Sequence, residues 1–475
     1  MWIIIKEKKA GTLQKAFLYT MQKLHLIAIG GSAMHNMALA LHEKGFIVTG
    51  SDDEINEPSK SRLAKAGLLP EEIGWFPDKI KGDLSAVILG MHAREDNPEL
   101  IRARQMGLKI YSYPEYIYEA TKEKTRIVIG GSHGKTTITA MILHVMNFLK
   151  IETDYLVGAQ LEGFNTMVSL TNTAQYAVIE GDEYLASPID KRPKFHLYKP
   201  NIAIISGIAW DHINVFPTFE IYVDQFKKFI NLIEPNGSLI YCSEDKVLDE
   251  VCRTTSNTKI DKMPYSVPKH QIENGTTYLL VNDQKIPLQI FGNHNLMNLN
   301  GARLVCNKIG ILNTQFYEAI QSFKGAAKRL ELVYKKDNFN FYKDFAHSPS
   351  KLKATTDAVK KQFTKRKIIA CMELHTFSSL NEEFLAQYKD SMNLADEAIV
   401  YFNPHTIAHK KLKEITPEQV HACFNRKDLR VFTKSSEVTD YLKSKKWKDS
   451  VLLMMSSGNF DGVDFNGLAQ NLSPS

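Results

Sequence analysis

The sequence predicts an α/β protein of three domains, each built on a mostly parallel sheet. Three observations lead to this prediction: a length of 475 residues, short apolar runs that alternate with amphipathic stretches, and glycine turns between several of them. By the usual size of domains this length corresponds to about three of them. We expect an extension over residues 1–20, then domains over 21–123, 124–325 and 326–475.

The first expected domain opens with a βαβ unit. An apolar strand over residues 24–29 leads into Gly30 and Gly31, and an amphipathic helix and a second strand follow. The two glycines leave the backbone free to approach a pyrophosphate. The dinucleotide fingerprint is incomplete because Ala28 and Ala33 stand at two of its glycine positions, so a nicotinamide cofactor is only weakly supported.

The second expected domain opens with a glycine-rich loop in "IVIGGSHGKTTITAMILHVM", residues 127–146. The standard phosphate-loop spacing fails because it requires a glycine where Ile129 stands. The glycines nevertheless let backbone N–H groups and the helix N-terminus face an anion. A solvent-facing Lys135 is expected to reach terminal phosphates, and Thr136 to place its hydroxyl on a magnesium ion. The competing interpretation, a plain strand-to-helix turn, gives no role to Lys-Thr.

Acidic residues and a histidine follow two later strands of this domain. Glu180 ends one apolar run, and Asp211-His212 end another. Ligands of open α/β sheets bind at the carboxyl ends of the strands, so these side chains are expected near the phosphates, where they suit a hard divalent ion. The alternatives are a solvated acidic turn for residues 180–183 and a capping or core role for His212.

Further candidates lie towards the C-terminus. Asn295 and Asn298 are three residues apart on one face of an expected helix and suit an adenine edge, with helix capping as the alternative for one of them. Arg329 stands at the expected domain boundary, where a surface cation is the common alternative. Asp344 ends a strand of the third domain, and His347 lies in the turn that follows.

Composition narrows the classes of function. The formal charge of +6 arises among 59 basic and 53 acidic residues, so no nucleic-acid partner is expected and an anionic small substrate fits. Five cysteines without a CxxC pair argue against a disulfide framework or a structural zinc site. No membrane span or signal peptide is evident, so a cytoplasmic location is expected. Met21 is a second candidate start, since the first strand follows it.

The order of motifs "GGSHGKTT", "EGDEY", "WDH", "GNHNLMN", "KRLE" and "DFAHSP" resembles that of the Mur ligase family, over essentially residues 21–475. The resemblance implies ATP-dependent amide formation in peptidoglycan synthesis, with ATP and Mg²⁺ as cofactors. It also implies an N-terminal Rossmann-like domain for a UDP-sugar, a central phosphate-loop ATPase-type domain and a C-terminal Rossmann-like domain. ATP would phosphorylate the lactyl carboxylate of UDP-N-acetylmuramate, and an amine would attack the acyl phosphate.

The resemblance also assigns residues to roles. It gives Lys135 to the β- and γ-phosphates, and it gives Thr136, Glu180 and His212 to magnesium. Asn295 and Asn298 fall to the adenine side, and Arg329, Asp344 and His347 to the closing domain. The remaining ATP-site candidates are Gly131, Ser132, His133, Gly134 and Thr137. The UDP-sugar candidates are Gly30, Gly31, Ser32, Ser51 and Asp52.

Within the family, "DEYLASPIDKRPKF" resembles the murein peptide ligase branch, which adds L-alanyl-γ-D-glutamyl-meso-diaminopimelate during peptidoglycan recycling. The expected amine is therefore this tripeptide, and the alternative is L-alanine. Lys191, Arg192 and His375 are candidate cations for the tripeptide's carboxylates. The chain departs from the branch at Ser348, where a second histidine is common, and at His375, near a usual arginine. Lys227, a possible carbamylated lysine, stays unassigned.

Two other classes of protein explain parts of the sequence. A dehydrogenase would explain the first βαβ unit but leaves the Gly-Lys-Thr loop and the metal ligands without a role. A nucleic-acid-stimulated ATPase would explain the loop but not the other two domains. Neither class accounts for all three segments.

Overall fold

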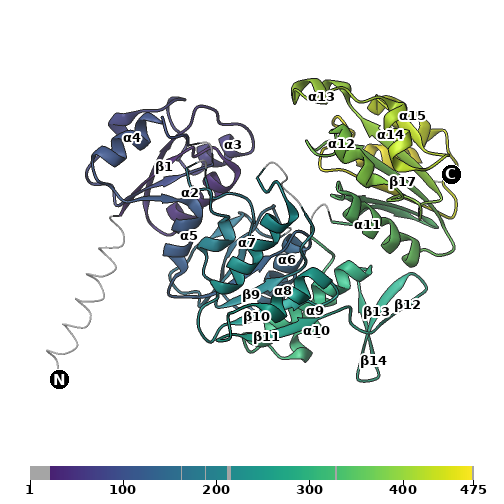
Figure 1. The fold of residues 1–475 in the computed structure, drawn as a ribbon, viewed down its shortest axis with the longest axis horizontal. Helices are drawn as coiled ribbons and strands as arrows, with labels where there is room; N and C mark the ends of the chain where they lie inside the picture. Colours follow the sequence, from purple (N-terminus) through teal and green to yellow (C-terminus); the bar gives the residue numbers. More distant parts are fainter. Residues whose placement is uncertain are drawn as a thin grey trace. The chain divides into compact units, whose positions relative to one another are not determined.

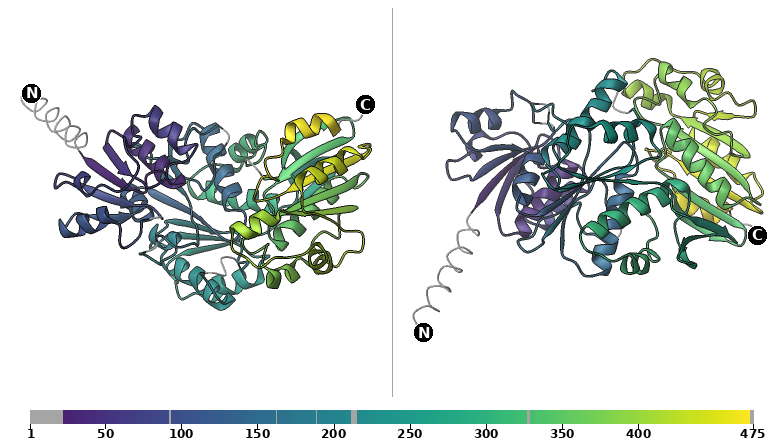
Figure 2. Two further views of the ribbon diagram at one scale, coloured as in Figure 1. Left: turned by 90° about the horizontal axis from the view of Figure 1, so that it is seen from above. Right: turned by 60° about the horizontal axis from the view of Figure 1, so that its bottom comes forward.

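Sheets covered by helices make up the structure, a computed structural model of the chain; Figures 1 and 2 show them coloured from purple through teal to yellow along the sequence. The structure describes residues 22–472 apart from His92, Glu162, Pro188, 211–214 and 327–328. The expected extension over residues 1–20 lies outside the described residues, as does His212. One compact unit comprises Met1–Ser266 with Gly301–Phe316, and the other comprises Val267–Asn300 with Tyr317–Ser475.

The first sheet of the first unit is parallel throughout and has the strand order β2-β1-β3-β4. Its strands are β1 (Lys23–Ile27), β2 (Ile47–Ser51), β3 (Ala86–Leu89) and β4 (Ile110–Ser112). Its helical segments are α2 (Ser32–Glu43), α3 (Ser59–Lys65), η1 (Pro77–Lys79), α4 (Pro98–Gln105) and α5 (Tyr113–Thr121). Ser112 and Glu115 form a capping box that fixes the start of α5.

The second sheet of this unit has the order β11-β10-β9-β5-β8-β6-β7, and only β7 is antiparallel to its neighbour. Its strands are β5 (Thr125–Gly130), β6 (Thr153–Leu156), β7 (Val168–Ser169), β8 (Tyr176–Glu180), β9 (Ile202–Ile205), β10 (Ser238–Cys242) and β11 (Asp261–Tyr265). The helical segments between them are α6 (Lys135–Phe148), η2 (Lys194–Leu197), α7 (Phe219–Asn231) and α8 (Lys246–Thr254). Because β5 lies between β8 and β9, the ends of three strands meet at the glycine loop.

The second unit contains a small antiparallel sheet and a larger, mostly parallel one. The small sheet consists of β12 (His270–Glu273), β13 (Thr276–Val281) and β14 (Gln284–Leu288). The larger has the order β15-β16-β20-β17-β18-β19, in which β15 (Glu331–Lys336) pairs antiparallel with β16 (Phe339–Asp344). Its other strands, all parallel, are β17 (Lys367–Leu374), β18 (Glu397–Phe402), β19 (Arg430–Phe432) and β20 (Ser450–Met455).

Both faces of the larger sheet are buried. On β17, Ile368 and Ala370 face one hydrophobic cluster, and Ile369 and Cys371 face another, as the alternation of side chains along a strand requires. The helical segments of this unit are α11 (Pro349–Gln362), α12 (Glu382–Leu385), η3 (Ala386–Tyr388), α13 (Pro404–His409), α14 (Pro417–Phe424), α15 (Ser435–Lys443) and α16 (Phe465–Leu472). The division between the units falls inside α9 (Asn293–Lys308) and α10 (Asn313–Ile320).

The predicted α/β class with mostly parallel sheets is confirmed. The exact domain limits expected from the sequence stay a prediction. In the described residues, no helix has both the length and the apolar character needed to cross a membrane.

Candidate active site

The glycine loop joins β5 to α6 through two residues with left-handed backbone. Gly131 has φ +123° and Gly134 has φ +79°, values that side chains strain to adopt. A Cβ on Gly131 would also lie 2.9 Å from the backbone nitrogen of Ser206, at the end of β9. Both glycines are therefore required by the backbone path, which brings the loop close to the neighbouring strand end.

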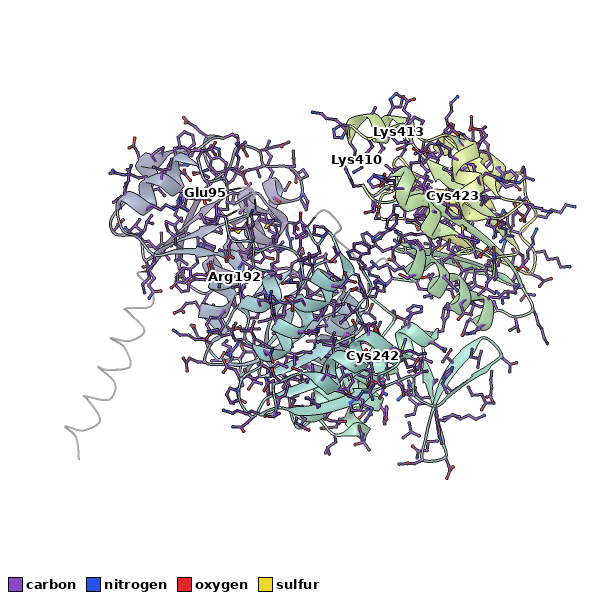
Figure 3. The ribbon with its side chains drawn as sticks, in the orientation of Figure 1. Glu95, Arg192, Cys242, Lys410, Lys413 and Cys423 are labelled. Atoms are coloured by element: carbon purple, nitrogen blue, oxygen red, sulfur yellow. The ribbon has the colours of Figure 1, made fainter. Side chains whose placement is uncertain are left out.

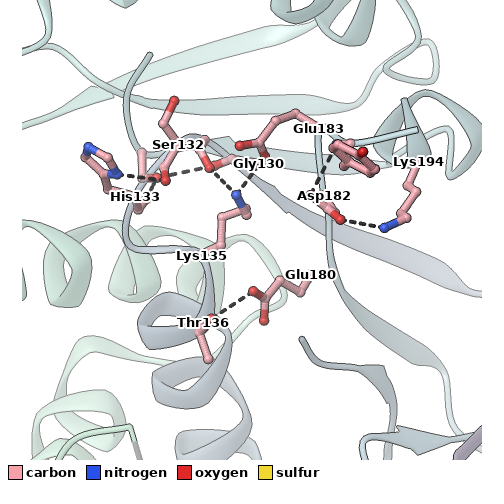
Figure 4. Close-up of polar contacts among 12 residues, drawn as sticks. Gly130, Ser132, His133, Lys135, Thr136, Glu180, Asp182, Glu183 and Lys194 are labelled. Carbon is pink, nitrogen blue, oxygen red and sulfur yellow. Dashed lines mark hydrogen bonds and ion pairs between the residues drawn. The ribbon is translucent and has the colours of Figure 1, made fainter. Parts of the chain in front are cut away.

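Lys135 begins α6 and turns into the protein rather than towards solvent. Its Nζ donates to the carbonyl oxygen of Gly131 at 2.7 Å and to Oε2 of Glu183 at 2.6 Å (Figure 4). The side chains are only 15% and 1% exposed. Burial alone lowers the pKa of Lys135, but the attraction of Glu183 and other carboxylates outweighs it and raises that pKa. The expectation of a solvent-facing lysine is wrong, because a buried carboxylate attracts the ammonium group.

The turn after β8 directs three carboxylates to three different partners (Figure 4). Glu180 accepts from the Thr136 hydroxyl at 2.8 Å, Asp182 is 2.6 Å from the ammonium nitrogen of Lys194, and Glu183 holds Lys135. The interpretation of this turn as merely solvated therefore fails for Glu183, which is buried.

Asp182 stays ionised in this environment. Burial raises its pKa, but Lys194 and Lys135 outweigh that effect and bring the pKa down to about 2. The turn thus adds fixed negative charge beside the lysine of the loop.

Two oxygen groups here suit a divalent cation. The Thr136 hydroxyl and the Glu180 carboxylate are in contact, and Glu180 also accepts from the backbone nitrogen of Gly158 at 2.9 Å. Magnesium is commonly held by one or two such protein groups together with phosphate oxygens and water, so the pair fits this ion. Among the described residues no cluster of three or more His, Cys, Asp or Glu side chains has the arrangement of a metal site.

The first βαβ turn places its predicted residues around the start of α2. The backbone nitrogen of Gly30 donates to Oδ2 of Asp52 at 2.7 Å, Ser51 is fully buried, and Ser32 is exposed at the helix start next to Gly31. Burial raises the pKa of Asp52 to about 6, although the hydrogen bond from Gly30 acts to lower that pKa. Four of the five UDP-sugar candidates thus lie at or next to this turn, and the fifth, Ser51, is buried at the end of β2.

Helix α9 carries the two predicted asparagines near its N-terminus, both buried, at 6% and 8% exposure. The side-chain amide of Asn295 donates to the carbonyl oxygen of Phe291 at 2.9 Å, so this donor is used within its own chain segment. This bond is not a helix cap, because a capping side chain accepts from a backbone N–H, so the capping alternative is not shown for Asn295. The roles of both asparagines stay predictions.

The predicted residues of the C-terminal domain gather at the end of β16. Asp344 accepts from the backbone nitrogens of Leu330 at 2.6 Å and Ala346 at 2.8 Å. Arg329 lies over the ring of Phe345 at 4.6 Å from its centroid. Asp344 thereby connects the segment before β15, at Leu330, with the turn after β16, at Ala346.

His347 and His375 each face an oxygen group in the same domain. His347 Nδ1 is 2.8 Å from the carbonyl oxygen of Phe345. His375 Nδ1 lies 3.6 Å from Oε1 of Glu373, a carboxylate that is only 3% exposed. A buried carboxylate beside His375 does not suit recognition of a second carboxylate.

Of the remaining lysines and arginines singled out in the sequence, Arg192 is engaged in ion pairs. Arg192, labelled in Figure 3, lies 2.8 Å from Glu115 of α5 and 2.6 Å from Asp190. Lys191 and Lys227 are exposed. Sequence reasoning did not find Lys194 or the partners of Arg192, since they are separated in the chain and no motif marks them.

Comparisons with known proteins agree over most of the chain. Three family models match: the catalytic domain of the Mur ligase family over residues 23–125, the Mur ligase middle domain over 129–306, and the glutamate ligase domain of Mur ligases over 328–458. A UDP-N-acetylmuramate–L-alanine ligase of Caldicellulosiruptor bescii is 30% identical, with 93% of this chain and 97% of the relative covered. One from a Sulfurihydrogenibium species is 28% identical, with 95% and 98% covered.

Solved structures share the fold. The UDP-N-acetylmuramate–alanine ligase of Thermotoga maritima superimposes with a TM-score of 0.67 at 20% identity, covering 95% of this chain and 98% of that one. A murein peptide ligase from Psychrobacter arcticus gives a TM-score of 0.60 at 22% identity with the same coverage.

Proposed function

Because this chain belongs to the Mur ligase family, whose members are ATP-dependent ligases that form C–N bonds, we propose that it joins an amine to the lactyl carboxylate of UDP-N-acetylmuramate. The observation that carries the proposal is the buried Lys135 at the glycine loop, with Thr136 and Glu180 in contact beside it. A cation and a metal-binding pair side by side are what phosphoryl transfer to a carboxylate requires.

The reaction proceeds in two steps. The carboxylate oxygen of the sugar attacks the γ-phosphorus of ATP, which gives an acyl phosphate and ADP. The amine nitrogen then attacks the acyl carbon, loses a proton and expels inorganic phosphate. The first step brings two anions together, and in the second negative charge develops on the departing phosphate, so positive charge at the loop must offset both.

We assign the loop and its surroundings to ATP. Lys135 binds the β- and γ-phosphates together with backbone groups of Gly131, Ser132, His133 and Gly134, with Thr137 in the first helical turn. Thr136, Glu180 and His212 would hold Mg²⁺, which would neutralise phosphate charge when bound. We expect Asn298 and Asn295 on the adenine side, Asn295 through its amide oxygen because its amide nitrogen is bound to Phe291, and we expect Arg329, Asp344 and His347 to act from the closing domain. Gly30, Gly31, Ser32, Ser51 and Asp52 form the UDP-sugar site.

For the amine, L-alanine is the leading candidate. The full-length relatives at 28–30% identity are named as L-alanine ligases. Two contacts in the structure support this choice. Arg192 is paired with Glu115 and Asp190, and His375 lies next to Glu373, so both candidate cations already have a carboxylate beside them. The comparisons therefore favour the alternative over the tripeptide expected from the sequence.

The tripeptide L-alanyl-γ-D-glutamyl-meso-diaminopimelate is the second candidate. It is favoured by the connection from Asp182 to Phe195, which folds back on itself: Lys194 N donates to the carbonyl oxygen of Tyr184, and Ala186 N donates to that of Arg192. This folded connection is the segment that resembles the murein peptide ligase branch.

The decisive experiment measures ADP release with UDP-N-acetylmuramate, ATP and Mg²⁺, with each amine in turn. A higher kcat/KM for L-alanine supports the leading candidate, and a higher value for the tripeptide reverses the order. No ADP release with either amine, in protein that binds ATP, would contradict the proposed function itself.

A further inference from the structure

We propose that Tyr222 is a positioning residue of the phosphate loop: its hydroxyl stabilises Glu183 when Lys135 leaves that carboxylate to bind the terminal phosphates of ATP. The inference rests on the proposed function in one respect, that ATP is the ligand of the loop. It adds a residue from helix α7 that belongs to none of the sequence motifs described above.

The hydroxyl of Tyr222 lies at the centre of a buried hydrogen-bond network. It donates to Oε1 of Glu183 at 3.1 Å, and its oxygen is 2.8 Å from the Ser132 hydroxyl. Ser132 Oγ in turn accepts from the backbone nitrogen of Ala209 at 2.9 Å. Because Tyr222 donates to Glu183, Ser132 is the donor in the contact between the two hydroxyls.

This network joins four separate elements. Ser132 belongs to the glycine loop, Glu183 to the turn after β8, Tyr222 to α7, and Ala209 to the segment after β9. The ring of Tyr222 is fully buried and packs against Phe216 and Phe226, with ring centroids 5.4 and 5.3 Å away. The hydroxyl is therefore held in place by the packing of its own ring.

Glu183 divides its two oxygens between a mobile and a fixed donor. Lys135 occupies Oε2 at 2.6 Å, while Tyr222 occupies Oε1. Lysine has a flexible stem that can turn towards a phosphate, whereas the tyrosine is anchored. A buried carboxylate that loses its hydrogen bonds costs free energy, so the donor that remains lowers the cost of releasing Lys135.

The test compares Tyr222→Phe with wild type by calorimetric titration of ATP in the presence of Mg²⁺. The variant keeps the ring and removes only the hydroxyl. The hydroxyl bonds Glu183 in the free protein as well, so only its gain in strength after Lys135 leaves affects binding, and we expect the Kd for ATP to rise about fivefold. The matched control is Tyr198→Phe, because the Tyr198 ring is equally buried and its hydroxyl neighbours Tyr113 rather than Glu183 or Lys135. That control should bind ATP as wild type does.

A double-variant cycle separates positioning from a general structural effect. If Tyr222 acts through Glu183, Tyr222→Phe should change the Kd for ATP less than twofold in a Glu183→Gln background, because the charge it stabilises is gone. An unchanged Kd in the single variant, full additivity in the cycle, or a Tyr222→Phe protein that does not fold would each overturn the proposal. Failure of wild type to bind ATP would instead contradict the proposed function.

Discussion

The hydroxyl of Thr136 donates to the carboxylate of Glu180 across 2.8 Å and so joins the first turn of α6 to the end of β8. The two residues are 44 positions apart in the chain, and the pairing of β5 with β8 brings them together. A threonine and a carboxylate in contact at the carboxyl edge of a parallel sheet are placed to share one cation.

Replacement of Glu180 by glutamine should raise the Mg²⁺ concentration that half-saturates ADP release by at least about tenfold, because metal sites lose that much when a supporting group is altered. The amide keeps the shape and can accept from Thr136 through its oxygen, but its NH2 group cannot accept from the backbone nitrogen of Gly158, and the charge is lost. A magnesium titration measures the effect, with Glu250→Gln on the exposed side of α8 as the control. The same half-saturating Mg²⁺ concentration in both variants would show that Glu180 does not bind the metal.

Replacement of Lys135 by methionine should abolish ADP release and also destabilise the protein. Glu183 would be left buried without its cation, which costs about 3 kcal/mol, the low end for removal of one partner from a buried pair. Chemical denaturation of the ligand-free protein measures this loss. Adding Glu183→Gln should restore most of the stability but none of the activity; a single variant as stable as wild type would argue against the pair.

Stability should depend on pH through Asp52. Its pKa is raised from 3.8 to about 6 by burial, so between about pH 4 and pH 6 the folded protein binds more protons than the unfolded chain. The free energy of unfolding should therefore fall as pH rises through this range, by at most about 3 kcal/mol and by less where solvent screens the group. Melting temperatures of Asp52→Asn and wild type, measured across this pH range, test the prediction. The melting temperature of the variant should fall less steeply with rising pH than that of wild type, and equal dependence on pH in both proteins would contradict the prediction.

Arg192→Ala should leave the choice of amine nearly unchanged. Arg192 is exposed and committed to Glu115 and Asp190, and exposed ion pairs contribute below about 1 kcal/mol, so the ratio of kcat/KM for tripeptide and L-alanine should shift less than about fivefold. Lys259→Ala, at an exposed position after α8 with no proposed role, is the control. A larger shift of this kcat/KM ratio in Arg192→Ala, without one in the control, would indicate that Arg192 contacts the amine substrate.

Local patterns predicted the parts of the site that lie next to strand ends. The apolar run before Gly130 and the helical spacing after Lys135 marked a strand, a loop and a helix, and all three are present. The proximity of Glu180 to Thr136 followed from the rule that strands of a parallel sheet end at the same edge.

Contacts between side chains far apart in the sequence could not be predicted. Lys135 was expected to face solvent, because the motif does not reveal that Glu183 is buried beneath it. Arg192 was expected to await a substrate, yet its partner Glu115 is 77 residues away on α5. Such pairings depend on how helices pack against the sheet, and periodicity carries no information about that.

The position of β5 between β8 and β9 also bears on how the protein folds. The strands are not consecutive, so Thr136, Glu180 and Ser206 can meet only after chain segments of many residues have closed. Formation of the proposed ATP site should therefore lag behind formation of helices during refolding. Binding of a fluorescent ATP analogue would then report completion of this sheet, and a binding signal that appeared together with the first helical signal would show that the site forms early.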